Sequence, residues 1–156
     1  MKISTYLRTE HIFLRTPLPD KDAVLRFVAD TCAEIGLVSD ADTLYDGMRK
    51  REETMSTGIG GGIGFPHTTS REARDACVIL IRLAEPVDFE ALDTLPVDLI
   101  IALVIPENQT ALHLGILAGA SRLCLKPEFL KAVRKAENPE KLFNTIVSIE
   151  DKMPFH

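Results

Sequence analysis

Two long apolar stretches constrain the fold of this chain more than any other feature of its sequence. They cover residues 77–81 and 97–105, and Asp98 is the only polar residue in either. A strand with one face in water alternates apolar and polar residues, whereas a strand covered on both faces is apolar at successive positions. Neither stretch is long enough to span a bilayer. The sequence therefore predicts two central strands of a sheet, covered by helices on both faces.

The segments around these strands carry the spacing and the end signals of helices. Asp20 is expected to cap a first helix that closes at Gly36, and Ser39 is expected to cap a second. Later helices are expected from Asn108 as a cap, with the helix over about residues 109–125, and from Pro127 and Asn138-Pro139 as starts. Helices and strands together predict one α/β domain over residues 1–156.

Three shorter segments are less regular. Residues 85–89 are interpreted as a turn and an edge strand. Ile63 and Phe65 alternate with glycine, which favours a short strand running into Pro66. Thr69, with Glu72 three residues later, is expected to cap a short helix or a turn.

Composition and charge exclude several classes of partner. Acidic residues outnumber basic ones by 23 to 18, and a net charge of -5 would repel nucleic acid and anionic lipid. The N-terminus lacks the apolar segment of a signal peptide, so a cytoplasmic protein without membrane insertion is expected. Three cysteines lie far apart without paired spacing, and the histidines show no metal-ligand spacing, so buried thiols are expected and no metal site.

Five of the nine glycines lie within residues 58–64, directly before Pro66 and His67. The phosphate-binding sequence GxxxxGK requires a lysine that this segment lacks, and the dinucleotide motif GxGxxG fails from every glycine here. Nucleotide binding is therefore not expected. A neutral imidazole is a nucleophile near neutral pH. Glycine amides, with a hydroxyl from Ser56 or Thr57, can surround a phosphoryl group on His67.

Two further residues are candidates for the same anion. His113 is expected near the positive end of the helix after Asn108, where a neutral imidazole can donate to a phosphate. Arg51, seven residues before the glycine run, can offer a fork of donors. The alternative is that His67 is a polar turn residue beside a glycine bulge, that His113 belongs to the core and that Arg51 is solvated. For His67 these residues alone do not decide between the two interpretations, whereas for His113 and Arg51 taken alone they favour the structural one.

The order of several motifs resembles the fructose/mannitol-type enzyme IIA domains of the bacterial phosphotransferase system, closest to their nitrogen-regulatory branch. The resemblance covers roughly residues 10 to 148. Its motifs are Arg51-Glu52, Ser56-Thr57-Gly58-Ile59-Gly60-x-Gly62-Ile63-Gly64-Phe65-Pro66-His67, Val87-Asp88-Phe89-x-Ala91-x-Asp93, Pro96-Val97-Asp98-Leu99 and Pro106 to His113-Leu114.

The resemblance implies a single-domain α/β sandwich, with a mixed sheet flanked by helices on both faces. It implies phosphorylation of His67 by phosphorylated HPr or a nitrogen-type paralogue, with His113 and Arg51 near the phosphate and no nucleotide or metal. The expected phosphate-binding loop is Ser56, Thr57, Gly58, Gly60, Gly62, Gly64 and Thr68. Two residues depart from the family pattern, which usually has alanine at Gly64 and glycine at Thr68.

Three functions are compatible with this resemblance. The first is a nitrogen-regulatory phosphocarrier, whose phosphorylation state controls its binding to other proteins. The second is a sugar-specific subunit that passes phosphate to the enzyme IIB of a fructose- or mannitol-type permease. The third is a regulatory binding module that has the fold but does not transfer phosphate. The segment from Pro96 to Pro106, with Asn108 to Thr110 after it, favours the first.

Overall fold

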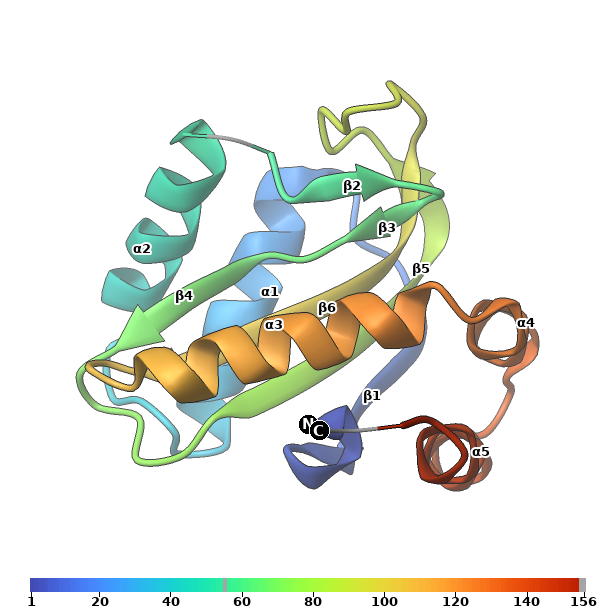
Figure 1. Cartoon of the computed structure of the whole chain (residues 1–156). Coiled ribbons are helices and arrows are strands. Elements are labelled where there is room, and N and C mark those ends of the chain that lie inside the picture. The colour runs from blue at the N-terminus through green and yellow to red at the C-terminus, as the bar shows by residue number, and fades with distance from the viewer. Residues whose placement is uncertain (55, 155–156) are drawn as a thin grey trace.

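The computed structural model describes residues 1–54 and 56–154, which form one mixed β-sheet with helices on both faces (Figure 1). The strand order is β1-β5-β6-β3-β2, and β4 also pairs with β6. The sandwich expected from the sequence is confirmed. The helices and strands are η1 (Ile3–Thr5), β1 (Leu7–Thr16), α1 (Lys21–Glu34), α2 (Ala41–Thr54), β2 (Gly58–Gly60), β3 (Ile63–Gly64), β4 (His67–Ser70), β5 (Cys77–Val87), β6 (Val97–Pro106), α3 (Thr110–Cys124), α4 (Pro127–Lys135) and α5 (Pro139–Asp151).

The two apolar stretches form the centre of the sheet, as the sequence predicted. Successive side chains of β6 enter two separate clusters. Ile101 and Leu103 pack with α3, α4 and α5, whereas Ile100 and Ala102 pack with α1 and α2 on the opposite face. Each fully buried side chain of this size contributes roughly 1.5–3 kcal/mol. Burial on both faces therefore explains why apolar residues follow one another without alternation.

Strands β3 and β4 run parallel to β6 and lie end to end along it. Ile63 pairs with Leu99, and His67 pairs with Leu103, four positions farther along β6. A backbone hydrogen bond joins the strands directly before His67, because Leu103 N donates to the Pro66 carbonyl at 3.0 Å. The segment that begins at His67 is thus fixed to the most buried strand of the sheet.

Several local predictions are confirmed. The carboxylate of Asp20 accepts a hydrogen bond from Ala23 N at 2.8 Å, and the amide oxygen of Asn138 accepts one from Lys141 N at 3.0 Å. Pro127 begins α4, and Gly36 follows α1 with φ +78°. The three cysteines are buried and free. Across the residues that the structure describes, none of the helices has the length and apolarity that a bilayer crossing requires.

Two predicted caps are wrong by one position. Asp40, rather than Ser39, caps α2, because its carboxylate accepts from Thr43 N at 3.1 Å, while Ser39 N donates to Glu72 at 2.9 Å. Asn108 has a left-handed backbone, φ 64°, and the residue before α3 is Gln109 without a side-chain cap. When two neighbouring residues can both cap a helix N-terminus, contacts with distant parts of the chain determine which of them does so.

Two predicted connections are also wrong. Residues 85–87 continue β5, with Val87 paired to Val97, instead of forming a separate edge strand. Thr69 lies within β4 and caps nothing. The turn after it is held by Ser70, whose hydroxyl oxygen accepts from Glu72 N at 3.1 Å and Ala73 N at 3.2 Å.

Candidate functional site

His67 is the first residue of β4, and only 9% of its surface is exposed. The sequence placed it directly after a glycine-rich segment, and the structure adds that it begins a strand. Strand pairing with β6 holds its backbone, and α2 packs beside β4. Its side chain therefore has few alternative positions.

The two ring nitrogens of His67 have different partners. Nδ1 lies 2.8 Å from the carbonyl oxygen of Phe65. Because a carbonyl only accepts hydrogen bonds, Nδ1 must carry the proton. Nε2 then has a free lone pair, and it accepts from Nε of Arg51 at 3.2 Å. A fixed tautomer with an in-plane lone pair on Nε2 is the state that nucleophilic attack requires.

His113 completes a cluster of three side chains from three elements. Its ring centroid lies 5.8 Å from that of His67, with 70° between the ring planes. His113 is half-buried in the first turn of α3, and Arg51 is exposed in the last turn of α2. The structure thus brings together the three residues that the sequence singled out, two of them 46 residues apart.

The pKa of His67 lies below its ordinary value. Burial is the main cause, and the positive charge of Arg51 and the nearby His113 lower the pKa further. The Phe65 carbonyl and the Glu52 carboxylate act in the opposite direction. The net result is an uncharged imidazole at neutral pH, so the lone pair on Nε2 is available.

This lowered pKa predicts how acceptance of a phosphoryl group depends on pH. The sequence predicts that His67 accepts a phosphoryl group, and only a neutral imidazole can do so, so a pKa below about 6.5 would keep the site active to lower pH than an ordinary histidine would. We expect the single-turnover rate of phosphorylation to be constant between about pH 7 and 8, and to fall only below pH 6.5. A rate that has already fallen to half or less at pH 6.5, with the donor kept saturating, would contradict the lowered pKa.

Glu52 holds the backbone around the site and was missed as a site residue by the sequence analysis. It is buried, and its carboxylate accepts from Thr57 N at 2.9 Å and from Thr57 Oγ1 at 2.6 Å. Lys21 Nζ lies 3.6 Å away. The Thr57 carbonyl in turn accepts from Phe65 N at 3.0 Å. The spacing in the sequence could have identified Glu52, because it follows the buried residues Leu44 and Met48 at intervals of four and so lies on the same buried face of α2.

Glu52→Ala is therefore expected to destabilise the fold. The substitution leaves the buried amide and hydroxyl of Thr57 without their acceptor and Lys21 without its partner, at a cost of about 3 kcal/mol. The free energy of unfolding in urea measures this. Glu53→Ala is the matched control, because Glu53 is exposed and forms a surface ion pair with Arg49 at 3.1 Å, so a change within about 0.5 kcal/mol is expected. Equal values for the two variants would refute the structural role of Glu52.

The glycine-rich segment forms a β-hairpin, with its tip away from the imidazole. Gly60, Gly61 and Gly62 have φ between +67° and +100°, which the turn between β2 and β3 requires. The tip contacts other groups, because Gly61 N donates to Asp93 at 3.0 Å. It lies five or more residues from His67 along the chain, or roughly 15 Å. The structure therefore does not bring Gly60 and Gly62 to His67.

The remaining residues of the expected phosphate loop also have structural contacts. Gly58 pairs with Gly64 across the hairpin. The Ser56 hydroxyl donates to the Phe89 carbonyl, and the Thr57 hydroxyl donates to Glu52. Thr68 follows His67 in β4, where adjacent side chains point to opposite faces, and its hydroxyl donates to the Thr69 carbonyl at 3.3 Å. Among the predicted residues, Arg51 and His113 are the ones that contact the His67 ring.

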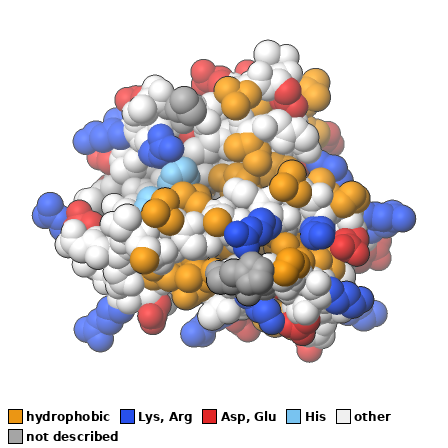
Figure 2. Space-filling view, viewed as in Figure 1, with side chains coloured by type: hydrophobic (Ala, Val, Ile, Leu, Met, Phe, Trp, Pro, Cys, Tyr) orange, Lys and Arg blue, Asp and Glu red, His pale blue; other side chains and the backbone are white. Residues whose placement is uncertain are grey.

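Basic and apolar side chains share the surface on the face of the molecule that carries the cluster. Figure 2 shows histidine side chains at the surface of this face, between Lys/Arg side chains and a group of hydrophobic ones. Leu114, next to His113, is 64% exposed, and Leu92 is 72% exposed. Leu92 N donates to the Gly58 carbonyl, so this leucine lies at the β2–β3 hairpin together with the exposed Ile59. Exposed apolar side chains beside a reactive group are typical of a protein-docking surface.

Comparison with known proteins gives consistent matches over nearly the whole chain. Residues 5–149 match the family described as phosphoenolpyruvate-dependent sugar phosphotransferase system, EIIA 2. The fructose-specific EIIA component of Haloferax volcanii is 30% identical over 147 residues, which are 94% of this chain and 96% of that protein. A nitrogen regulatory protein of Pseudomonas aeruginosa is 29% identical over 151 residues, 97% and 98% of the two chains. The crystal structure of nitrogen regulatory protein IIA-Ntr from Neisseria meningitidis superposes with a TM-score of 0.84 at 27% identity, covering 92% of this chain and 98% of that one.

Proposed function

This chain belongs to the EIIA 2 family of the phosphoenolpyruvate-dependent sugar phosphotransferase system, and we propose that it carries a phosphoryl group on Nε2 of His67. The observation that carries the proposal is the pair of contacts on this ring. Phe65 holds the proton on Nδ1, and Arg51 approaches the lone pair on Nε2 at 3.2 Å. A cation at that lone pair marks the place that an anionic phosphoryl group would occupy.

The proposed reaction is a transfer between two histidines. The donor is phosphorylated HPr or a nitrogen-type paralogue, whose nitrogen–phosphorus bond breaks while a bond from Nε2 of His67 to phosphorus forms. The electron pair of the broken bond stays on the donor imidazole. Nδ1 of His67 keeps its proton, and the Phe65 carbonyl accepts a stronger hydrogen bond from the more positive ring. Phosphoryl transfer of this kind depends on positioning and on charge, and it requires little other chemistry from the protein.

Arg51 and His113 have separate roles in this proposal. Arg51 leaves the lone pair as the phosphoryl group arrives and places its fork of N–H donors on the phosphate oxygens. Its exposed side chain in the last turn of α2 has room for this movement. The ring of His113 lies 5.8 Å from that of His67, within the first turn of α3, where the helix N-terminus favours an anion. The apolar residues Ile59, Leu92 and Leu114 are the proposed contacts of the donor and acceptor proteins.

His113→Ala is expected to slow transfer from the donor without removing the acceptor atom. The substitution deletes one hydrogen-bond donor to the phosphoryl group, and losses of this kind are about ten- to a thousandfold. Single-turnover transfer from a phosphorylated donor measures the rate. Leu114→Ala is the neighbouring control, expected to weaken donor binding at limiting concentration and to leave the saturated rate unchanged. An unaltered saturated rate in His113→Ala would show that its proposed role is wrong.

Within the family, we infer a nitrogen-regulatory carrier, which controls partner proteins through its phosphorylation state. The match to the Neisseria meningitidis nitrogen regulatory structure over 92% of the chain supports this branch. The similarly strong match to a fructose-specific EIIA component supports the alternative, a subunit that passes phosphate to an enzyme IIB. The two differ in the acceptor, not in the chemistry at His67.

Reconstituted phosphorylation tests the proposal. The purified chain is incubated with phosphoenolpyruvate, enzyme I and either HPr or its nitrogen-type paralogue, and intact mass is measured. We expect a gain of one acid-labile phosphoryl group per chain, faster with the paralogue. Subsequent loss of that group to a fructose-type enzyme IIB would support the sugar-specific alternative. No gain from either donor would favour the third function, a binding module that does not transfer.

A further inference from the structure

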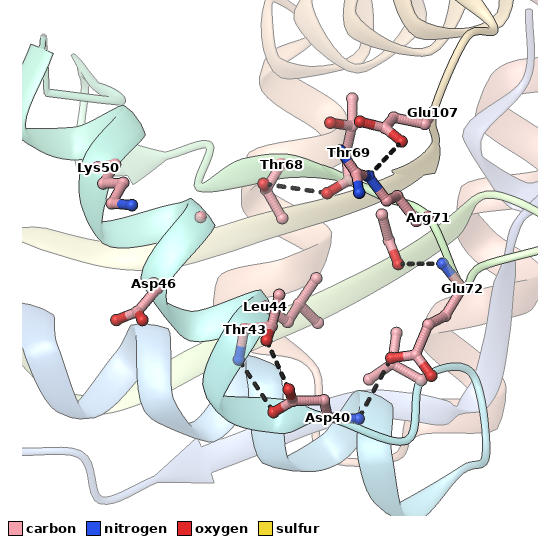
Figure 3. Close-up of a pocket in the computed structure, with 13 residues that line it drawn as sticks. Asp40, Thr43, Leu44, Asp46, Lys50, Thr68, Thr69, Arg71, Glu72 and Glu107 are labelled. Atoms are coloured by element: carbon pink, nitrogen blue, oxygen red, sulfur yellow. Dashed lines mark hydrogen bonds and ion pairs between the residues drawn. The ribbon is translucent and has the colours of Figure 1, made fainter.

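Helix α2 lies along β4, and a polar cavity of about 480 Å³ separates parts of the two elements (Figure 3). Lys50 and Asp46 line it from the helix, and Thr68 lines it from the strand. At one point the elements touch directly, because the Thr68 side chain packs against the backbone of Gly47. This contact lies one residue beyond His67 in β4.

Gly47 is in the interior of α2, where glycine is unfavourable relative to alanine. A Cβ atom at this position would lie 2.7 Å from Thr68 Oγ1 and 3.8 Å from Thr68 Cβ. Contacts below 3.0 Å are not tolerated, so either the helix or the threonine would have to move by several tenths of an ångström. Thr68 is β-branched, so its χ1 angle is restricted. The hydroxyl of Thr68 thus explains the glycine opposite it.

The same two elements carry the contact between Arg51 and His67. Arg51 follows Gly47 by four residues, which places both on one face of α2. His67 precedes Thr68 by one residue in β4. Helix α2 therefore contacts two successive residues of β4, Thr68 through Gly47 and His67 through Arg51. We propose that Gly47 and Thr68 are a positioning pair. Their close contact sets the distance between α2 and β4, and this distance determines whether Nε of Arg51 lies within hydrogen-bonding distance of Nε2 of His67.

The length of the hydrogen bond between Arg51 and His67 explains why the distance between α2 and β4 matters. Nε of Arg51 is 3.2 Å from Nε2 of His67, at the upper end of the usual range for such a hydrogen bond. A displacement of several tenths of an ångström lengthens this contact beyond that range. The pair also accounts for Thr68, where the family pattern usually has glycine. Its side chain lies on the opposite face of β4 from the His67 side chain, so it fills the gap beneath α2 and does not crowd the phosphoryl group.

The inference rests on the proposed function only for its effect on transfer, and a double-mutant cycle tests it. Gly47→Ala is made in the wild type and in Thr68→Ala, where the new methyl group meets only Cβ at an ordinary 3.8 Å. In the wild type we expect transfer at least tenfold slower, because small displacements of a positioning group cost this much. We also expect the pKa of His67, followed by NMR, to rise, because Arg51 lowers it. In the Thr68→Ala background both effects should disappear.

Stability gives a readout that does not depend on transfer. In the Thr68→Ala background, Gly47→Ala should raise Tm by about 3 °C, as alanine is the better helix residue. In the wild-type background the same substitution should lower Tm.

Asp46→Ala, at the neighbouring position of α2, is the control, and its effect on Tm should be the same with threonine or alanine at position 68. If Gly47→Ala changes Tm and the His67 pKa equally in both backgrounds, the positioning pair is refuted, whether or not the chain accepts phosphate. If the cycle shows coupling and no donor phosphorylates the wild type, the pair stands and the carrier function fails.

Discussion

His67→Asn is expected to abolish phosphoryl acceptance while the fold persists. The asparagine amide nitrogen lies where Nδ1 lies in histidine, so it retains a donor for the Phe65 carbonyl, but the variant has no atom equivalent to Nε2. Intact-mass analysis after incubation with phosphoenolpyruvate, enzyme I and the donor should show no added phosphoryl group. The wild type under the same conditions should be fully modified.

The stability of this variant separates chemistry from folding. Since His67 is buried in β4, we expect a cost of about 1–2 kcal/mol for His67→Asn, and more for His67→Ala, which also loses the bond to Phe65. Urea unfolding of both variants measures the difference. A phosphorylated His67→Asn chain would show that another residue is the acceptor. Loss of phosphorylation that appears only under conditions where the variant is unfolded would mean that His67 is structural.

Arg51→Ala is expected to slow transfer about a hundred- to a thousandfold, the usual effect of removing one donor to a developing anionic charge. The acceptor nitrogen remains, so slow phosphorylation should still reach completion. Arg51→Lys should recover little of the rate, because an ammonium group lacks the planar fork of the guanidinium. The measurement is the single-turnover rate with saturating phosphorylated donor.

The pKa of His67 gives a second measurement on Arg51→Ala, which depends on the contact between Arg51 and His67. Arg51 lowers the pKa of His67, so Arg51→Ala should raise it and shift the fall in rate to higher pH. Arg49→Ala is the matched control on the same helix, because Arg49 pairs with Asp46 and Glu53 at the surface. If Arg51→Ala transfers within twofold of the wild type with an unchanged pH profile, Arg51 has no part in the reaction.

Local signals in the sequence predicted much of the fold. The caps Asp20 and Asn138 and the central strands β5 and β6 were predicted because each depends on nearby residues or on the absence of alternation. The start of α2 was not, since Ser39 and Asp40 are both good caps, and the contact of Ser39 with Glu72 depends on a residue 33 positions away.

The site was predicted as a set of residue types and not as a geometry. His67, Arg51 and His113 were correctly grouped, yet the hydrogen bond between Arg51 and His67 depends on how α2 packs on β4. The glycines were interpreted as a phosphate cradle, whereas Gly60, Gly61 and Gly62 form a hairpin turn. Positive φ angles serve both purposes, so composition does not distinguish them. The contact of Thr68 with Gly47 joins residues 21 positions apart and has no local signal.

The nitrogen that carries phosphorus decides whether His67 accepts the group on Nε2. Phosphorylated protein with ¹⁵N-labelled histidine is examined by NMR for coupling between phosphorus and the ring nitrogens of His67. Because the Phe65 carbonyl holds the proton on Nδ1, we expect phosphorus bonded to Nε2 and a retained proton on Nδ1. Phosphorus bonded to Nδ1 would contradict it, since that nitrogen faces the backbone and has no free lone pair.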